Sequence, residues 1–434
     1  MDPEWIGRTF TSDVGWTHLE RLVDVGSRMA GTDGERAGRE ATGEALARAG
    51  ARDVSVDEFP LQGWERGTST LAVGGTDQEC IALPRSPAAS ATGDLVHLGH
   101  GLPEDFERDL TGAVVVVSST VPDHVDRFVH RREKYHRAVE SGAAAFVFAN
   151  HVEGCLAPTG SVGGVSGPLG AIPAVGVSRE VGARLDRRFA GDEAAVTVDC
   201  ATPDATSANL HAEVGPDTDE EVLLTSHVDA HDIAEGAMDN GAGTATLVEV
   251  VRALADREAD LATRVRAVVF GAEEVGLVGS THEAERCATD RIRAVVNLDG
   301  LLRGRTLHAS THGFADLADA ARAVADRTGH PIEVVPEQVP HSDHWPFVAR
   351  GVPGYMVSGE SDERGRGWGH TRADTIDKLE RRNLRESAVL LTELVVELTG
   401  RPVDRRDPAD VAADLEAEGH AEGMRLTGDW PFDG

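Results

Sequence analysis

Lysine is almost absent from this sequence. Lys134 and Lys378 are the only two among 42 basic residues, and 74 acidic residues give the chain a formal net charge of -32. The acidic residues are spread along the whole chain, which favours adaptation to high salt, because dissolved ions weaken the repulsion between surface carboxylates. An ordinary acidic protein is the alternative to this halophilic interpretation. Nucleic acid is excluded as a partner, since phosphate binding needs a basic patch.

Cysteine is also scarce, and long apolar runs are missing. The cysteines are far apart and have no C-x-x-C spacing, so we predict reduced, packed thiols rather than a disulfide framework or a zinc cluster. They are Cys80, Cys155, Cys200 and Cys287. No apolar run approaches the length of a membrane span, and the N-terminal segment MDPEWIGRTFTSDVGW lacks the basic and apolar regions of a signal peptide. We therefore expect no membrane partner and a cytoplasmic location.

The length of 434 residues predicts two domains, and a hydrophobic fraction of 40% suffices for a buried core. Helical patterns and one alternating strand fill residues 14–61. The character changes between about 90 and 203, where buried strands, a charged helix and a glycine-rich stretch (159–178) follow one another. We interpret the glycine-rich stretch as a surface loop, because it has no phosphate-binding motif, and the polar segment 201–209 as a linker.

From residue 221 onward, predicted strands alternate with predicted helices. The strands are predicted over 221–227, 264–274, 292–300, 332–336 and 352–359. Alternation at this spacing implies βαβ units and a parallel or mixed sheet, which makes the chain an α/β protein. A long helix over 377–400 ends the pattern, and the tail after residue 403 is acidic and partly helical.

Five candidate metal ligands fall where a predicted strand ends or a predicted helix begins. They are His227, Asp239, Glu274, Asp299 and His370. In a mostly parallel sheet the carboxyl ends of the strands line one crevice, so these side chains should meet there. Three carboxylates and two imidazoles suit one or two Zn²⁺-like ions, and such a set is typical of a metal-assisted hydrolase.

Some of these residues also have a plainer explanation. His227 could be a surface histidine beside Asp229, although we expect the Asp229 carboxylate to bond the second ring nitrogen and fix the tautomer. Asp239 stands where an ordinary helix cap stands.

The pair Glu273 and Glu274 ends a buried strand, where two carboxylates are costly without a cation or a task. Because neighbouring residues point different ways, one of them could ligate a metal while the other takes a proton from water. In the segment GHTRADT, Asp374 is a candidate partner for the ring of His370.

The order and spacing of these segments resemble a known family. SHVDAH, GAMDNGAG, GAEEVGLVGS, NLDG, HSDHWPF and GHTRADT together resemble the zinc exopeptidases that include bacterial leucyl aminopeptidases, aminopeptidases S and Y, glutamate carboxypeptidase and the glutaminyl cyclases. The likeness covers residues 14–60 and about 205–400. It implies a three-layer α/β sandwich with a mostly parallel mixed sheet, interrupted by a smaller β-rich α/β protease-associated domain.

The resemblance also implies the domain limits. Residues 1–89 and 204–403 would form the peptidase domain, 90–203 the inserted domain, and 404–434 an acidic C-terminal extension.

Two zinc sites are implied in the same way, and each pairs a histidine with a carboxylate: His227 with Asp299, and His370 with Glu274. Asp239 would bridge the two ions, and Glu273 would be the general base. A cis peptide bond between Asp239 and Asn240 is also implied. Co²⁺ or Mn²⁺ could replace zinc, because carboxylate-rich sites accept several metals.

The sequence departs from the family in one respect. Family aminopeptidases often place a tyrosine near the S-D-H segment to steady the oxyanion, whereas this chain has only Tyr135 and Tyr355. We hypothesise that His341 supplies that hydrogen bond. The alternative is that His341 is a solvated loop residue and the metals suffice.

We therefore predict a dinuclear zinc aminopeptidase that removes N-terminal residues from peptide substrates. A water that bridges the metals, with its pKa lowered, would lose a proton to Glu273 and attack as hydroxide. A carboxypeptidase or dipeptidase that reads a substrate carboxylate with Arg303, Arg305 or Arg372 is the alternative. A glutaminyl cyclase and a non-catalytic receptor-like module are further alternatives, and assembly into a homo-oligomer stays open.

Overall fold

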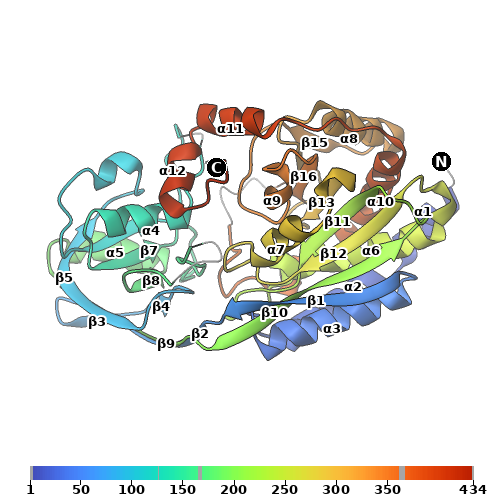
Figure 1. Cartoon of the computed structure of the whole chain (residues 1–434). Helices are drawn as coiled ribbons and strands as arrows, with labels where there is room; N and C mark the ends of the chain where they lie inside the picture. The colour runs from blue at the N-terminus through green and yellow to red at the C-terminus, as the bar shows by residue number, and fades with distance from the viewer. Residues whose placement is uncertain (1–2, 126, 165–168, 361–366, 433–434) are drawn as a thin grey trace.

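The computed structural model describes residues 3–125, 127–164, 169–360 and 367–432. The chain forms two lobes, each built around its own sheet, and long strands connect them along one edge (Figure 1). The larger lobe contains every candidate metal ligand named above.

The sheet of the larger lobe has eight strands, and its centre is parallel. From one edge to the other the strands are β1 (Arg52–Gln62), β10 (Asp204–Val214), β12 (Arg264–Phe270), β11 (Glu221–His227), β13 (Ile292–Leu298), β16 (Gly354–Gly359), β14 (Leu307–Ser310) and β15 (Ile332–Val335). Strands β12, β11, β13 and β16 run parallel to one another, whereas β1 and β10 are antiparallel neighbours. The predicted α/β fold with a mixed, mostly parallel sheet is confirmed.

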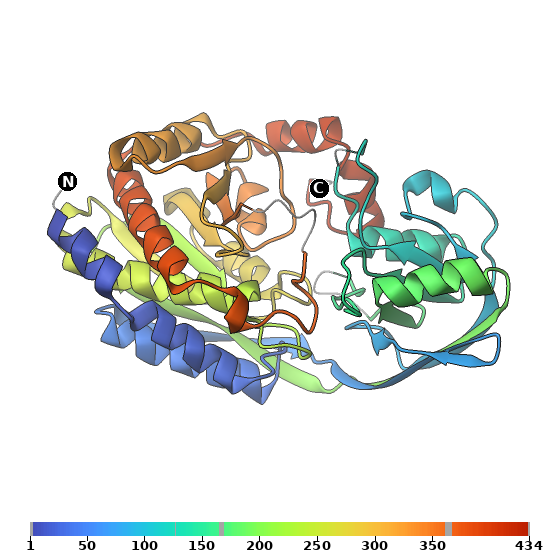
Figure 2. The same ribbon diagram turned by 180° about the vertical axis from the view of Figure 1, so that it is seen from behind.

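Helices cover both faces of this sheet. One face carries α2 (Val14–Val25), α3 (Asp33–Arg48), α6 (Gly243–Asp256), α8 (Ala315–Thr328) and α10 (Arg381–Gly400), with α1 (Pro3–Thr11) beside them (Figure 2). The other face carries α7 (Val278–Arg286) and the short α9 (Trp345–Val348). Side chains alternate along β11, so that Val222 and Leu224 belong to the larger core while Leu223 packs with Phe347 on the opposite face.

The second lobe contains the other sheet. Its strands, in spatial order, are β3 (Thr76–Gln78), β2 (Glu65–Val73), β9 (Glu193–Ala201), β5 (Ala89–His97), β6 (Val114–Ser118), β7 (Ala145–Ala149), β8 (Ala174–Val177) and β4 (Ile81–Ala82). Its two helices are α4 (Arg131–Glu140) and α5 (Arg179–Phe189). Strands β2 to β4 precede residue 90, so this sheet takes strands from both sides of the expected domain limit. The chain passes between the sheets after Gln62 and again after Ala201.

The predicted linker at 201–209 is wrong. Strand β9 ends at Ala201, and β10 begins at Asp204 and pairs with β1 in the register Leu61↔Ala205. The segment is polar because it crosses the surface between the lobes, yet its backbone is held by a partner strand.

The chain also contains short helical turns at η1 (Pro103–Phe106), η2 (Ala237–Ala242), η3 (Glu258–Asp260), η4 (Thr289–Arg291) and η5 (Ile376–Lys378).

The acidic C-terminal extension spans the two lobes. It forms α11 (Pro408–Ala417) and α12 (Ala421–Thr427), and α12 packs against α4 of the second lobe (Figure 1). Arg132 and Arg137 of α4 bind this extension, since one guanidinium lies 2.7 Å from Asp429 and the other 3.0 Å from Glu422. The extension therefore ties the inserted lobe to the rest of the chain.

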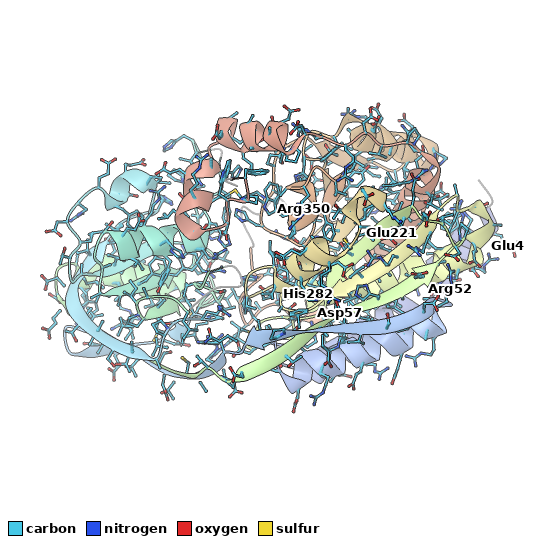
Figure 3. The ribbon with its side chains drawn as sticks, viewed as in Figure 1. Glu4, Arg52, Asp57, Glu221, His282 and Arg350 are labelled. Atoms are coloured by element: carbon cyan, nitrogen blue, oxygen red, sulfur yellow. The ribbon has the colours of Figure 1, made fainter. Side chains whose placement is uncertain are left out.

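Charged groups outside the site pair with one another. Asp57 on β1 lies 3.0 Å from the Nε2 atom of His282 on α7 (Figure 3) and 2.7 Å from Arg286. All four cysteines are free, and Cys155 is exposed rather than packed as predicted. Among the described residues, none of the helices is long and apolar enough to span a membrane. Salt adaptation, location and oligomeric state stay predictions.

Candidate metal centre

The carboxyl ends of three neighbouring strands meet at one site. His227 is the last residue of β11, Glu273 and Glu274 follow β12, and Asp299 follows β13. Two further loops complete the site: Asp239 comes from the turn η2 that precedes α6, and His370 from the loop between β16 and α10. All of these side chains are at least 91% buried, so the crevice predicted from the strand ends exists.

Asp239 stands between two groups of side chains. Its Oδ1 atom lies 3.5 Å from His227 Nε2, and its Oδ2 atom lies 3.0 Å from His370 Nε2. On the first side, His227 Nε2 is also 3.7 Å from Asp299 Oδ1. On the second side, His370 Nε2 is 3.2 Å from Glu274 Oε2. The two oxygens of one carboxylate thus face two separate histidine–carboxylate groups, as a bridging ligand requires.

The donor set fits a pair of zinc ions. Nitrogen and carboxylate oxygen are the donors that zinc takes when sulfur is absent. Buried polar atoms normally have hydrogen-bond partners, yet His227 Nε2 and Glu274 Oε1 make no hydrogen bond. Four buried carboxylates in contact with two imidazoles would repel one another without cations. The residues present therefore match the group that the sequence predicts.

The two adjacent glutamates have opposite electrostatic environments. Burial, with Glu274 and Asp343 nearby, raises the pKa of Glu273 well above its usual value. Glu274 is just as buried, but the imidazoles of His231 and His370 lower the pKa of its carboxyl. Neighbouring carboxyls with pKa values pushed apart are typical of an acid–base group beside a ligand, which supports the separate roles predicted for them.

Asp229 contributes to the site differently from the prediction. The ring nitrogen Nδ1 of His227 lies 3.1 Å from the backbone carbonyl of Asp229, nearer than the 3.5 Å to its carboxylate. The carboxylate instead accepts the backbone N–H groups of Glu273 at 3.0 Å and Glu274 at 3.1 Å. Asp229 therefore fixes the backbone that carries the candidate base and a candidate ligand.

Asp374 was expected to bond His370, and this expectation is wrong. Its carboxylate accepts the backbone N–H of Met238 at 2.7 Å and that of Asp239 at 3.1 Å. Burial raises the pKa of Asp374 to about 7. The loop that presents Asp239 is held from its other side by the buried Arg28, which donates to backbone carbonyls at Leu22, Val228, Glu235 and Gly236.

The turn around Asp239 is tight. The peptide bond between Asp239 and Asn240 is cis, as the resemblance implied. Asn240 donates to the carbonyl of Leu298 at 2.8 Å and accepts the N–H of Gly243 at 3.0 Å. A Cβ atom on Gly243 would lie 2.5 Å from the Leu298 oxygen, so only glycine allows this approach.

Two cavities, of about 260 Å³ and about 830 Å³, adjoin the ligands. His341 borders both of them and stacks on His130 of the second lobe, with ring centroids 4.7 Å apart. It is thus not a solvated loop residue remote from the site, although its role as an oxyanion donor stays a prediction. Trp430 of the C-terminal extension lines the smaller cavity together with Glu273.

Several residues of the site were missed by the sequence analysis. His231, His130 and Trp430 lie in segments whose contact with the ligands depends on how distant parts of the chain meet. The stretch at 159–178, which was predicted as a surface loop, is in part buried. The N–H of Thr159 at its start donates to the carbonyl of His370 at 2.8 Å. Residues 165–168 of that stretch lie outside the described residues. Only His231 had a local signal, as the second histidine of SHVDAH.

An α/β sheet whose strand ends present two histidine–carboxylate groups around a shared aspartate is typical of dinuclear metallohydrolases. Residues 209–395 match the model of Peptidase family M28, and residues 91–185 match that of the PA domain. The part of the chain over residues 209–395 therefore belongs to peptidase family M28, and a PA domain is inserted ahead of it.

Similar proteins extend over nearly the whole chain. Aminopeptidase YwaD of Bacillus subtilis is 26% identical over 406 residues, which cover 89% of this chain and 85% of that protein. The probable lipoprotein aminopeptidase LpqL of Mycobacterium tuberculosis is 26% identical, with 86% and 81% covered. Among solved structures, the aminopeptidase from Aneurinibacillus sp. strain AM-1 has a TM-score of 0.71 and 25% identity, with 94% of this chain and 97% of that chain covered.

Proposed function

We propose that the protein is a dinuclear zinc aminopeptidase, which releases N-terminal residues from peptides. The observation that carries this proposal is Asp239, whose two carboxylate oxygens face two histidine–carboxylate groups, with the raised-pKa carboxyl of Glu273 beside them. The aminopeptidases named above are similar to this chain over most of its length, and this similarity supports the same activity.

The chain's own residues supply proton transfer and orientation. Zinc ions, when bound, add positive charge that polarises a peptide carbonyl and lowers the pKa of water. Burial raises the pKa of Glu273 well above its usual value, so this carboxyl can take the proton of the attacking water and return it to the leaving amine. Asp229 accepts a hydrogen bond from the Glu273 backbone, and His341, which lines the cavity, would donate to the developing oxyanion.

The test is cleavage of aminoacyl-anilides, with N-blocked analogues alongside, across a range of salt concentrations. Cleavage of free but not blocked substrates, lost on chelation and restored by zinc, is the expected result. A Glu273→Gln enzyme should lose roughly 10²- to 10⁴-fold in kcat and still bind zinc, because only the proton acceptor is removed. The matched control is Glu285→Gln, which neutralises an exposed carboxylate on the same cavity. Near-normal turnover by Glu273→Gln contradicts the assignment.

One observation favours a carboxypeptidase as the second candidate. Arg303 lines the larger cavity together with Asp239 and Asp299, where it could meet a substrate carboxylate. Neither Arg305 nor Arg372 is among the residues that line the two cavities, which leaves Arg303 as the candidate. Release of C-terminal residues from N-blocked peptides, abolished by Arg303→Met, would establish this alternative.

A further inference from the structure

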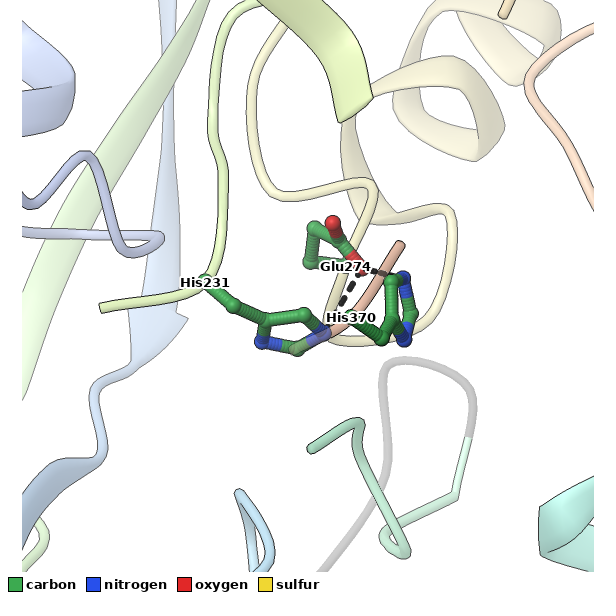
Figure 4. Close-up of side chains that lie close together, drawn as sticks. All are labelled: His231, Glu274 and His370. Atoms are coloured by element: carbon green, nitrogen blue, oxygen red, sulfur yellow. Dashed lines mark ion pairs between the residues drawn. The ribbon is translucent and has the colours of Figure 1, made fainter. Parts of the chain in front are cut away.

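His231 is a second histidine of the segment SHVDAH and is buried beside the ligands. It lies in the loop after β11, with 5% of its surface exposed. Its Nε2 atom is 2.9 Å from Glu274 Oε2, and its ring meets the ring of His370 edge-on, with centroids 4.4 Å apart (Figure 4). Donor atoms of these three residues all lie within 4.8 Å of one another.

The orientation of His231 does not match an ordinary hydrogen bond to Glu274. Although Nε2 is close to the carboxylate, neither ring nitrogen of His231 makes a hydrogen bond, and Glu274 Oε1 makes none either. A buried imidazole without hydrogen bonds is unusual, because buried polar groups are nearly always satisfied. His231 Nε2 and Glu274 Oε2 are therefore close together but not aligned for a hydrogen bond, which is the arrangement of two donors that share one metal ion.

The separations also agree with a zinc shell. Two donors each at 2.0–2.1 Å from a tetrahedral zinc lie about 3.3 Å apart. The second group shows 2.9 Å from His231 to Glu274, 3.2 Å from Glu274 to His370, and 3.0 Å from His370 to Asp239. A third acidic group with histidine, formed by Asp57, His211 and Glu283, gives no such indication, because arginines pair with its carboxylates.

We propose that His231 is a fourth protein ligand of the second zinc site, beside Glu274, His370 and the shared Asp239. This inference rests on the proposed function. It makes the two sites unequal: the second has four protein donors, which is typical of a closed, tightly held zinc, whereas the first has Asp239, His227 and Asp299 and keeps an open position. Zinc should therefore leave the first site before the second under chelation.

The direct test uses the intact protein loaded with cadmium-113 and labelled with nitrogen-15 in its histidines. A ring nitrogen bonded to cadmium shows scalar coupling to it, whereas a ring that only lies near the ion does not. We expect coupling at the rings of His227, His370 and His231, with the signals assigned by single His→Gln variants. Coupling at His227 and His370 but not at His231 overturns the inference and leaves the proposed function standing. No coupling at any of the three overturns both.

Zinc affinity gives a second readout that is independent of activity. Removing a residue that only orients a ligand weakens metal binding by about 10- to 100-fold, so loss of a ligand at His231→Gln should exceed about 100-fold at one of the two sites. His308→Gln is the control, since His308 pairs with Glu333 on the surface of the sheet edge. Two zinc ions bound by His231→Gln as tightly as by the parent protein contradict the inference.

Discussion

Substitution of Asp229 by asparagine tests how the protein positions its base and one ligand together. Asp229 is fully buried, and its two oxygens accept the N–H groups of Glu273 and Glu274 at 3.0 and 3.1 Å. Asparagine has the same shape but only one oxygen, so its amide group must face one of these N–H donors. One buried hydrogen bond is lost, and one N–H is left without an acceptor.

The size of the effect follows from that loss. A buried donor left unsatisfied costs about 1–3 kcal/mol, so the free energy of unfolding of the metal-free protein should fall by about that amount. The backbone N–H that loses its acceptor should shift, and the glutamate that carries it should shift with it. A displacement of about 1 Å in a catalytic group can cost about 100-fold in turnover. Zinc affinity should fall by about 10- to 100-fold, because Glu274 moves with its backbone.

Three assays separate these effects: urea unfolding of the metal-free protein, zinc competition with a chelator, and kcat for an aminoacyl-anilide. Asp232→Asn is the matched control, because Asp232 lies in the same loop but pairs with Arg66, at 2.6 Å. That variant should retain zinc affinity and kcat. If Asp229→Asn keeps its turnover and its zinc affinity, the carboxylate does not position Glu273 and Glu274, and the reasoning fails.

Two further predictions concern residues at the site, and a third concerns a residue remote from it. Asp374→Asn removes one of the two acceptors for the Met238 and Asp239 N–H groups, so chelator competition should show zinc bound about 10- to 100-fold more weakly; unchanged binding contradicts this. His341→Ala should lower kcat for an aminoacyl-anilide by about 10²- to 10³-fold with zinc still bound, and unchanged turnover removes His341 as the oxyanion donor. Burial lowers the pKa of His18 from 6.5 to about 3, so the folded ring stays neutral while the unfolded ring takes up a proton as the pH falls below 6.5. The free energy of unfolding of the metal-free protein, measured in urea, should therefore drop by about 2 kcal/mol between about pH 8 and about pH 5. The comparison is His18→Gln, in which this pH-dependent contribution should vanish.

The larger lobe could be predicted from the sequence because its signals are local. The apolar run at 221–227 coincides with β11, and the strand predicted over 292–300 contains β13. Strand β14 was missed, because its four residues, LHAS, include none of the β-branched residues that marked the equally short β15. The segment at 201–209 was predicted wrongly because its polar composition is typical of a linker. Pairing with β1 nevertheless makes most of the segment a strand.

The candidate ligands could be predicted because strand ends determine where they point, whereas the groups that hold them could not. Asp374 acts on the backbone of Asp239 across a separation in sequence that no local pattern reveals. His231 stands beside a predicted ligand, but its contact with Glu274 depends on how the loop after β11 folds back. Sequence spacing therefore identified the candidate ligands, while the hydrogen bonds that orient them required the structure.

The division of the site between lobes has a consequence for selectivity. Every candidate ligand and the candidate base come from the larger lobe, while His130 of the second lobe and Trp430 of the extension line the smaller cavity. The extension is anchored to the second lobe through Arg132 and Asp429, so these two walls are fixed relative to each other. Metal binding and proton transfer would thus depend on one lobe, whereas the space left for the substrate depends on both lobes and the extension. Changes in the wall residues alter which peptides fit without disturbing the atoms that hydrolyse them.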